Sequence, residues 1–164
     1  MKIKINELFL LQEKLDNVVH KNHNIKNPMD VFIQRKLALA VEIAELANEV
    51  KCFKYWSVKK GYNKEKIGDE YADVLHFILS HAIYLNSKKN EYSISGKIYD
   101  KQDLTKFFLK LLELSSQLSN PSDCEIFLSI FFEISTSLSL SVDDIINFYK
   151  NKNDVNLQRQ KNKY

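Results

Sequence analysis

The sequence predicts an all-α fold, organised as one domain that spans residues 1–164. Only three Gly and two Pro interrupt the chain, and hydrophobic residues make up 45% of it. This composition favours long helices over a sheet, which needs many turns. Apolar residues also recur at intervals of three and four in several long segments, as they do on one face of a helix. A chain of this length buries one substantial core and not two.

Three helices are expected in the first half of the chain. Apolar residues recur at helical spacing from Ile5 to Val19, and Pro28 then sets a new helix start. The second helix is long and has apolar residues on one face at steps of four and three. A short polar connection over residues 57–66 implies that the second and third helices are antiparallel neighbours. The expected ranges are 6–20, 29–56 and 67–85.

The second half begins with residues 86–100, which are polar, lack helical periodicity and indicate a long loop or insertion. Pro121 after Asn120 is typical of a helix N-terminus. Ser141 with Asp144 three residues later resembles an N-terminal capping box for a short last helix. The expected helices are 101–118, 121–138 and 141–150.

Composition and charge disfavour several other classes of protein. Cys52 and Cys124 lie in predicted helices without a partner at zinc-ligand or redox spacing, so both are expected to be reduced thiols. The N-terminus has no cleavable signal, and no apolar run reaches the roughly 18 residues of a membrane span. We therefore expect a cytoplasmic protein that does not bind membranes. The excess positive charge lies in residues 150–164, beside an acidic centre, which argues against nucleic acid as a partner.

Acidic residues in the second and third predicted helices form two matched motifs. Glu42, Glu45 and Glu49 follow at i, i+3 and i+7, and Glu70 and Asp73 at i, i+3. Their neighbours one turn later are apolar or acidic rather than basic, so the motifs do not form the ion pairs of an ordinary solvated face. If the helices are antiparallel, the two motifs can face each other. Four converging carboxylates provide hard oxygen ligands that suit Mg²⁺ better than Zn²⁺.

Two other interpretations of these acidic residues remain open. The acids can simply solvate helix surfaces, which is the usual role of one such motif alone. Asp73 and His76 also resemble half of a di-iron site in a helical bundle. Such sites use a Glu-x-x-His motif on each of two helices, and the second predicted helix has no His near Glu45. Two matched motifs on adjacent helices favour the magnesium reading.

The segment from Glu42 to Trp56, Glu-Ile-Ala-Glu-Leu-Ala-Asn-Glu-Val-Lys-Cys-Phe-Lys-Tyr-Trp, resembles the signature of the dimeric dUTPases. Residues 69–80 are similar to the second metal motif of that family. The resemblance extends to residues 11–16 and 149–164, whereas residues 86–147 carry no motif. It implies a helical bundle with a four-helix core, as in the all-α nucleoside triphosphate pyrophosphatases, and a homodimer. The phenylalanine-rich segment 127–132 adds weak support for the dimer, with a plain core segment as the alternative.

The resemblance implies a dUTP diphosphatase that hydrolyses dUTP to dUMP and pyrophosphate, with dUDP as a second candidate substrate. Mg²⁺ would activate the attacking water, and one carboxylate would accept its proton. Glu45 is the candidate base, with Glu42 as the alternative. The implied metal ligands are Glu42, Glu45, Glu70 and Asp73.

The same resemblance implies the residues that bind the nucleotide. Gln12 offers both the donor and the acceptor that the edge of uracil requires. Trp56 would form a wall of the nucleoside pocket, or else pack at a helix end, and His76 would bind base or sugar, or else be structural. The remaining candidates are Asp16, Lys54, Ser80 and Tyr149, with Lys152, Asn156 and Arg159 for the phosphates.

The C-terminal candidates follow at steps of four and three and therefore share one helical face. A tail that orders over bound nucleotide would exclude water, and the alternative is a frayed cationic tail. The sequence departs from the family in having Tyr55 in place of a second Trp, and Lys163 in place of a Gly before Tyr164. A related pyrophosphatase for another nucleotide, such as dCTP, and a non-catalytic interaction module remain alternatives.

Overall fold

The computed structural model describes residues 1–57 and 63–162 and confirms the all-α fold class. Two very short strands and two 3₁₀ helices accompany six α-helices in this part of the chain. The middle of the predicted connection 57–66 and the Lys163–Tyr164 ending lie outside the described residues. The elements are β1 (Lys2–Lys4), α1 (Asn6–Asn22), η1 (Pro28–Val31), α2 (Phe32–Val50), α3 (Lys64–Tyr84), β2 (Glu91–Ser93), α4 (Lys101–Gln117), α5 (Pro121–Glu133), η2 (Ile134–Leu138) and α6 (Val142–Lys161).

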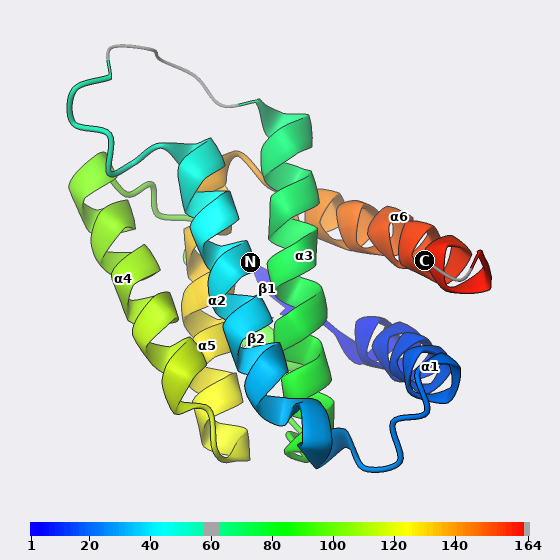
Figure 1. Cartoon of the computed structure of the whole chain (residues 1–164). Coiled ribbons are helices and arrows are strands. Elements are labelled where there is room, and N and C mark those ends of the chain that lie inside the picture. Colours follow the sequence, from blue (N-terminus) through cyan, green and yellow to red (C-terminus); the bar gives the residue numbers. More distant parts are fainter. Residues whose placement is uncertain (58–62, 163–164) are drawn as a thin grey trace.

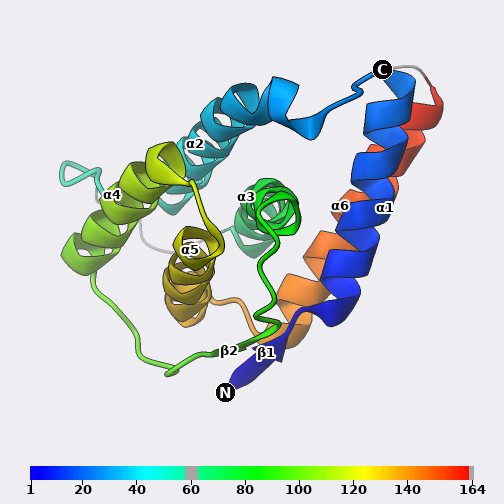
Figure 2. The ribbon, with the colours of Figure 1, turned by 90° about the horizontal axis from the view of Figure 1, so that it is seen from below.

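The central element is α3, which packs against α1, α2, α5 and α6 (Figures 1 and 2). More than half of its residues are buried, including Val74, Leu75 and Ile78. The first and last helices lie side by side on one flank of α3, while α2 and α4 lie together on the other. A helix with neighbours on several sides can place side chains in a cavity between them, and α3 does so between α2 and the α1–α6 pair.

A small antiparallel sheet joins the N-terminus to the segment after α3. Ile3 pairs with Tyr92, and both side chains are buried. The prediction of a long loop or insertion over 86–100 was incomplete, because β2 lies inside this segment. Strands of three residues are too short to show an alternating pattern in the sequence, and their pairing joins segments far apart in the chain.

The second helix ends at Val50, so the predicted extension to Trp56 was wrong. Lys51 adopts a left-handed conformation (φ 58°) and donates its backbone N–H to the Ala47 carbonyl, which closes the helix. Such an ending usually takes Gly or Asn. The lysine side chain does not indicate this ending, and Phe53, which lies within the predicted helix range 29–56, is 42% exposed.

The last helix is longer than predicted and includes the expected tail. The capping box of Ser141 and Asp144 begins it as expected, but it continues to Lys161 rather than ending near Lys150. Beyond Tyr149 the helix is largely polar, so hydrophobic periodicity could not reveal it. Its length comes from packing on α1, where Asn153 is buried and Asn22 donates to the Gln160 carbonyl.

Gly68 of α3 packs directly against the Phe148 ring of α6. A Cβ at this position would be 2.2 Å from Phe148 Cε2, which no van der Waals contact allows. We expect Gly68→Ala to lower the free energy of unfolding by about 1–3 kcal/mol, because this overlap outweighs the better helix propensity of Ala. Urea unfolding measures the change, and adding Phe148→Leu should restore part of it. A Gly68→Ala protein as stable as the wild type would contradict the close approach.

Within the described ranges, no single helix has the length and apolar character needed to cross a membrane.

Candidate functional site

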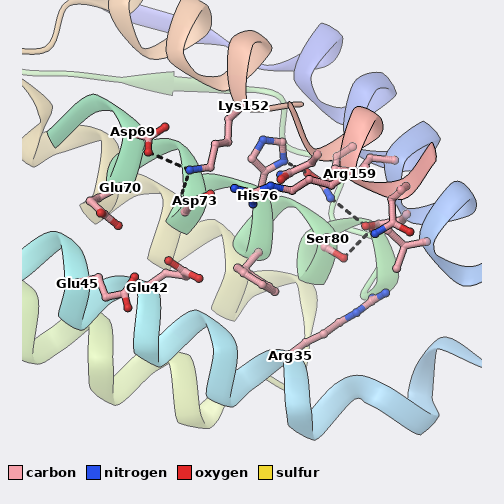
Figure 3. Close-up of a pocket in the computed structure, with 17 residues that line it drawn as sticks. Arg35, Glu42, Glu45, Asp69, Glu70, Asp73, His76, Ser80, Lys152 and Arg159 are labelled. Carbon is pink, nitrogen blue, oxygen red and sulfur yellow. Dashed lines mark hydrogen bonds and ion pairs between the residues drawn. The ribbon is translucent and has the colours of Figure 1, made fainter. Parts of the chain in front are cut away.

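A cavity of about 520 Å³ lies between α1, α2, α3 and α6 (Figure 3). It is lined by side chains from four helices, which include the first and the last α-helix of the described chain. The carboxylates of α2 and α3 lie toward one end, and Arg35 and Ser80 lie toward the other. The cavity brings together most of the residues that the sequence singled out: Gln12, Asp16, Glu42, Glu45, Glu70, Asp73, His76, Ser80, Lys152, Asn156 and Arg159.

Three carboxylates converge at one end of the cavity. One oxygen each of Glu42, Glu45 and Glu70 lies within 4.8 Å of the other two. The two glutamates of α2 are one turn apart, and α3 runs antiparallel beside them, so the motifs face each other (Figure 1). The spacing in the sequence and the antiparallel pairing thus bring together three of the four carboxylates that were expected to converge.

This cluster is electrostatically unfavourable without a cation. Burial raises the pKa of Glu42 to about 7, and the nearby charges of Asp73, Glu45 and Glu70 add to the rise. Burial and the charge of Asp73 also raise the pKa of Glu70. Like charges that are partly buried and uncompensated favour protonation or the binding of a counter-ion. An all-oxygen donor set with this charge fits a hard divalent cation.

Asp73 points toward α6 rather than into the three-carboxylate cluster. Lys152 Nζ lies 2.6 Å from Asp73 Oδ2 and 3.0 Å from Asp69 Oδ2 (Figure 3). Burial tends to lower the pKa of Lys152, but its bonds to the two aspartates outweigh burial and raise it. The side chain of Lys152 is only 11% exposed. Lys152 therefore neutralises the part of the acidic site that faces the last helix.

A hydrogen-bonded network occupies the part of the cavity next to α1. Gln12 is 3% exposed, and its Nε2 donates to Asp16 Oδ1 at 2.8 Å. Ser80 Oγ donates to Asp16 Oδ2 at 2.7 Å. The Gln12 carbonyl accepts from the Tyr149 hydroxyl and contacts His76 Nδ1, both at 2.7 Å. Each polar group thereby holds its neighbour in one orientation.

His76 is neutral in this network. Burial lowers the pKa of His76 to about 3. Because Gln12 Oε1 can only accept, His76 Nδ1 carries the proton. The imidazole ring also stacks on Tyr149, with 4.1 Å between ring centroids. Tyr149 is fully buried and supports Gln12 and His76 from behind rather than lining the cavity.

Two further residues of the predicted site lie away from the cavity. Lys54 Nζ donates to Asn48 Oδ1 at 2.8 Å, outside the cavity. Trp56 is 63% exposed, and its ring meets Tyr55 edge-on. The family resemblance implied both as nucleotide-binding residues, and the second helix was expected to reach Trp56. Because that helix ends at Val50, Trp56 does not lie on it beside the acids.

The cavity also contains Arg35 and Asp69, to which the sequence reading assigned no site role. Arg35 extends from α2 into the cavity (Figure 3). Its position seven residues before Glu42 places both on one face of α2, and this spacing was the available signal. Asp69 begins the segment 69–80 that resembles the second metal motif, and its partner Lys152 is distant in the sequence.

Comparison with known proteins agrees with these observations. A family model described as dUTPase matches residues 4–164. The match covers every helix that lines the cavity and also residues 86–147, where no motif was found. No curated protein matches the chain.

Proposed function

Since this chain belongs to the dUTPase family and is a dUTP diphosphatase, we propose that it uses Mg²⁺ to cleave dUTP into dUMP and pyrophosphate. The observation that carries the metal dependence is the convergence of Glu42, Glu45 and Glu70 within 4.8 Å. Their mutual repulsion supports a role in holding a cation. Asp73 would be the fourth ligand, on the side of the cluster that faces Lys152.

The acids and the bound ions have separate tasks in this proposal. Bound Mg²⁺ would neutralise phosphate oxygens and lower the pKa of a water molecule. Glu45 is exposed at the edge of the cluster, where it can accept the proton of an attacking water. Glu42 is the alternative base and is more deeply placed.

The last helix would hold the phosphates. Lys152, Asn156 and Arg159 lie on one face of α6 and line the cavity. The helical geometry presents the charged groups together, and the planar guanidinium of Arg159 suits bidentate contact with phosphate oxygens. An ordered α6 over the part of the cavity that would hold the phosphates also limits the access of water.

The network next to α1 would bind the nucleoside. Gln12, Asp16 and Ser80 present polar groups to the cavity, and His76 fixes the orientation of the Gln12 amide. The Gln12 carbonyl already has two partners, and one Nε2 hydrogen is donated to Asp16. The second Nε2 hydrogen is therefore the group that Gln12 can donate to the nucleobase. Lys54 and Trp56 lie outside the cavity and take no part in this proposal.

Release of pyrophosphate from a panel of nucleotides tests this function. We expect turnover of dUTP with Mg²⁺, loss of turnover with a chelator, and recovery when Mg²⁺ is restored. The panel includes dCTP, dTTP, UTP and dUDP. Preference for dCTP would contradict the assignment of the nucleobase site, whereas the proposed role of the acidic cluster would still stand. Equal dUTP turnover in excess chelator would contradict the metal proposal.

We also propose that the chain forms a homodimer through α2. Ile33, Leu37 and Val41 follow at steps of four and are 78%, 68% and 46% exposed, which leaves an apolar stripe on this helix. The segment 127–132 does not provide such a surface, because its phenylalanines are fully buried in the core. A continuous apolar stripe on an exposed helix face is typical of an interface between subunits.

The dimer proposal predicts that Leu37→Glu produces a monomer, because a charge cannot be buried unpaired in an apolar interface. Light scattering after gel filtration measures the mass. Leu10→Glu is a matched control, because Leu10 is 67% exposed on α1, which lies on the opposite flank of α3 from α2. A monomeric wild type, or a Leu37→Glu protein that remains dimeric, would refute this interface.

A further inference from the structure

Arg35 lies at the end of the cavity that is opposite the acidic cluster (Figure 3). It lies seven residues before Glu42 on α2, about 10 Å along the helix axis. Helical side chains incline toward the N-terminus, which carries the guanidinium farther from the acids. Figure 3 shows Arg35 extending toward the part of α3 that bears Ser80. A cation at this distance from the metal ligands is badly placed for the reacting phosphates.

The guanidinium of Arg35 is held in place by the first helix. Arg35 Nη2 donates to His20 Nε2. Arginine has no acceptor, so His20 accepts this bond with a neutral ring. Burial and the charge of Arg35 lower the pKa of His20, in agreement with that state. The contact uses one of five guanidinium N–H donors, so an arginine anchored here can still present others to a ligand.

Polar groups along α1 form a row of alternating donors and acceptors. Gln12, Asp16 and His20 follow at i, i+4 and i+8 and therefore lie in line on one helix face. Gln12 Nε2 gives one hydrogen to Asp16 and has a second. The Asp16 carboxylate accepts from Gln12 and Ser80, which leaves about two of its four acceptor sites. Because Arg35 is bonded to His20, the row presents in order a donor from Gln12, an acceptor from Asp16 and a donor from Arg35.

We propose that Arg35 binds the O4 carbonyl of uracil and selects uracil over cytosine, an inference that rests on the proposed base site. The uracil edge presents O2, N3–H and O4, which is acceptor, donor, acceptor. It therefore complements Gln12, Asp16 and Arg35 in that order. O4 is the atom of this edge farthest from the sugar. It faces Arg35 because the phosphates lie at the acidic end of the cavity.

Cytosine fits this row poorly. Its 4-amino group is a donor and would meet the guanidinium, and its unprotonated N3 would meet the Asp16 carboxylate. Two mismatched contacts leave buried polar groups unpaired, which a site built for hydrogen bonding rejects strongly. Thymine presents the same edge as uracil, so this row does not separate the two.

Steady-state rates with dUTP and dCTP at saturating Mg²⁺ test the assignment in the full-length protein. We expect Arg35→Gln to raise the KM for dUTP and to lower the ratio of kcat/KM for dUTP over dCTP about 10- to 100-fold. Arg35→Lys keeps the charge without the planar fork and should give a smaller loss. Lys36→Gln is the matched control. Lys36 is the next residue on α2, also half-buried, and donates to the Ser116 carbonyl outside the cavity.

The outcomes separate this inference from the proposed function. A wild-type protein that turns over dUTP, with an unchanged dUTP/dCTP ratio in Arg35→Gln and Arg35→Lys, would overturn the role of Arg35 alone. An equal loss for both nucleotides would assign Arg35 to phosphate or to packing and overturn it too. Absence of Mg²⁺-dependent dUTP turnover in the wild type would instead overturn the proposed function. Should Arg35→Gln fail to fold, the ratio in Arg35→Lys decides the question.

Discussion

Glu45→Gln is expected to lower kcat for dUTP by roughly 10²- to 10⁴-fold at saturating Mg²⁺, the range typical of losing a general base. Glu45 contributes one of the three oxygens that converge within 4.8 Å. Gln keeps the size of the side chain but has neither the charge to hold a cation nor the basicity to accept a proton. The loss should therefore appear in turnover rather than only in KM.

Glu49→Gln is the matched control for this prediction. Glu49 lies one turn beyond Glu45 on α2 and carries the same charge, but it does not belong to the converging set. Its kcat should stay within about threefold of the wild type, as expected for a substitution away from the reacting groups. A Glu45→Gln protein that keeps more than a tenth of its activity, or an equal loss in Glu49→Gln, would contradict the assignment.

The stability of Glu45→Gln separates a chemical defect from a folding defect. The charge of Glu45 raises the pKa of both Glu42 and Glu70, so in the absence of metal it opposes the fold. Removing that charge should leave the thermal unfolding midpoint in chelator unchanged or higher. A lower midpoint in chelator would mean that the variant loses activity through the fold.

The sequence predicted the parts of this site that depend on local spacing. Glu42 and Glu45 converge with Glu70 because residues three apart share a helix face and a short connection makes the helices antiparallel. The helix starts at Asn120 and Ser141 were also predicted from local patterns, namely Pro121 after Asn120 and the capping box of Ser141 and Asp144. Hydrophobic periodicity and the positions of the few Pro and Gly residues were therefore sufficient to predict the fold class.

The parts that the sequence missed depend on contacts between distant segments or on unusual backbone. Lys51 ends α2 in a left-handed conformation that its residue type does not announce. The pairing of Ile3 with Tyr92 joins two strands too short to recognise. The side-chain carbonyl of Gln12 is bonded to His76 and Tyr149 inside the protein, and no local sequence pattern indicates these contacts. Such roles follow from packing rather than from spacing.

Lys152→Met is expected to reduce kcat/KM for dUTP by about 100-fold and to destabilise the protein without ligand. The activity falls because a charge-assisted contact to phosphate is lost, which is worth about 1.5–3 kcal/mol. Stability falls because Asp73, whose side chain is 19% exposed, loses the cation 2.6 Å away. A fully buried carboxylate left unpaired costs about 3–5 kcal/mol, and screening at this partly exposed pair reduces the cost to about 1–2 kcal/mol.

Lys150→Met provides the control for both effects. Lys150 is also on α6 and pairs with Glu7 at 2.8 Å, but both side chains are exposed and outside the cavity. Its loss should change the free energy of unfolding by less than about 1 kcal/mol and leave kcat/KM nearly unchanged. Urea unfolding and steady-state rates measure the two quantities.

Mg²⁺ distinguishes the two roles of Lys152. If Asp73 joins the metal ligands, a bound cation replaces part of the charge that Lys152 supplies. Saturating Mg²⁺ should then recover stability in Lys152→Met but not its activity, because the phosphate contact stays lost. Mg²⁺ could instead change the stability and activity of Lys152→Met no more than it changes those of Lys150→Met. In that case Asp73 is not a metal ligand and serves only to hold Lys152. Full recovery of activity would show that Lys152 acts through Asp73 rather than through the nucleotide.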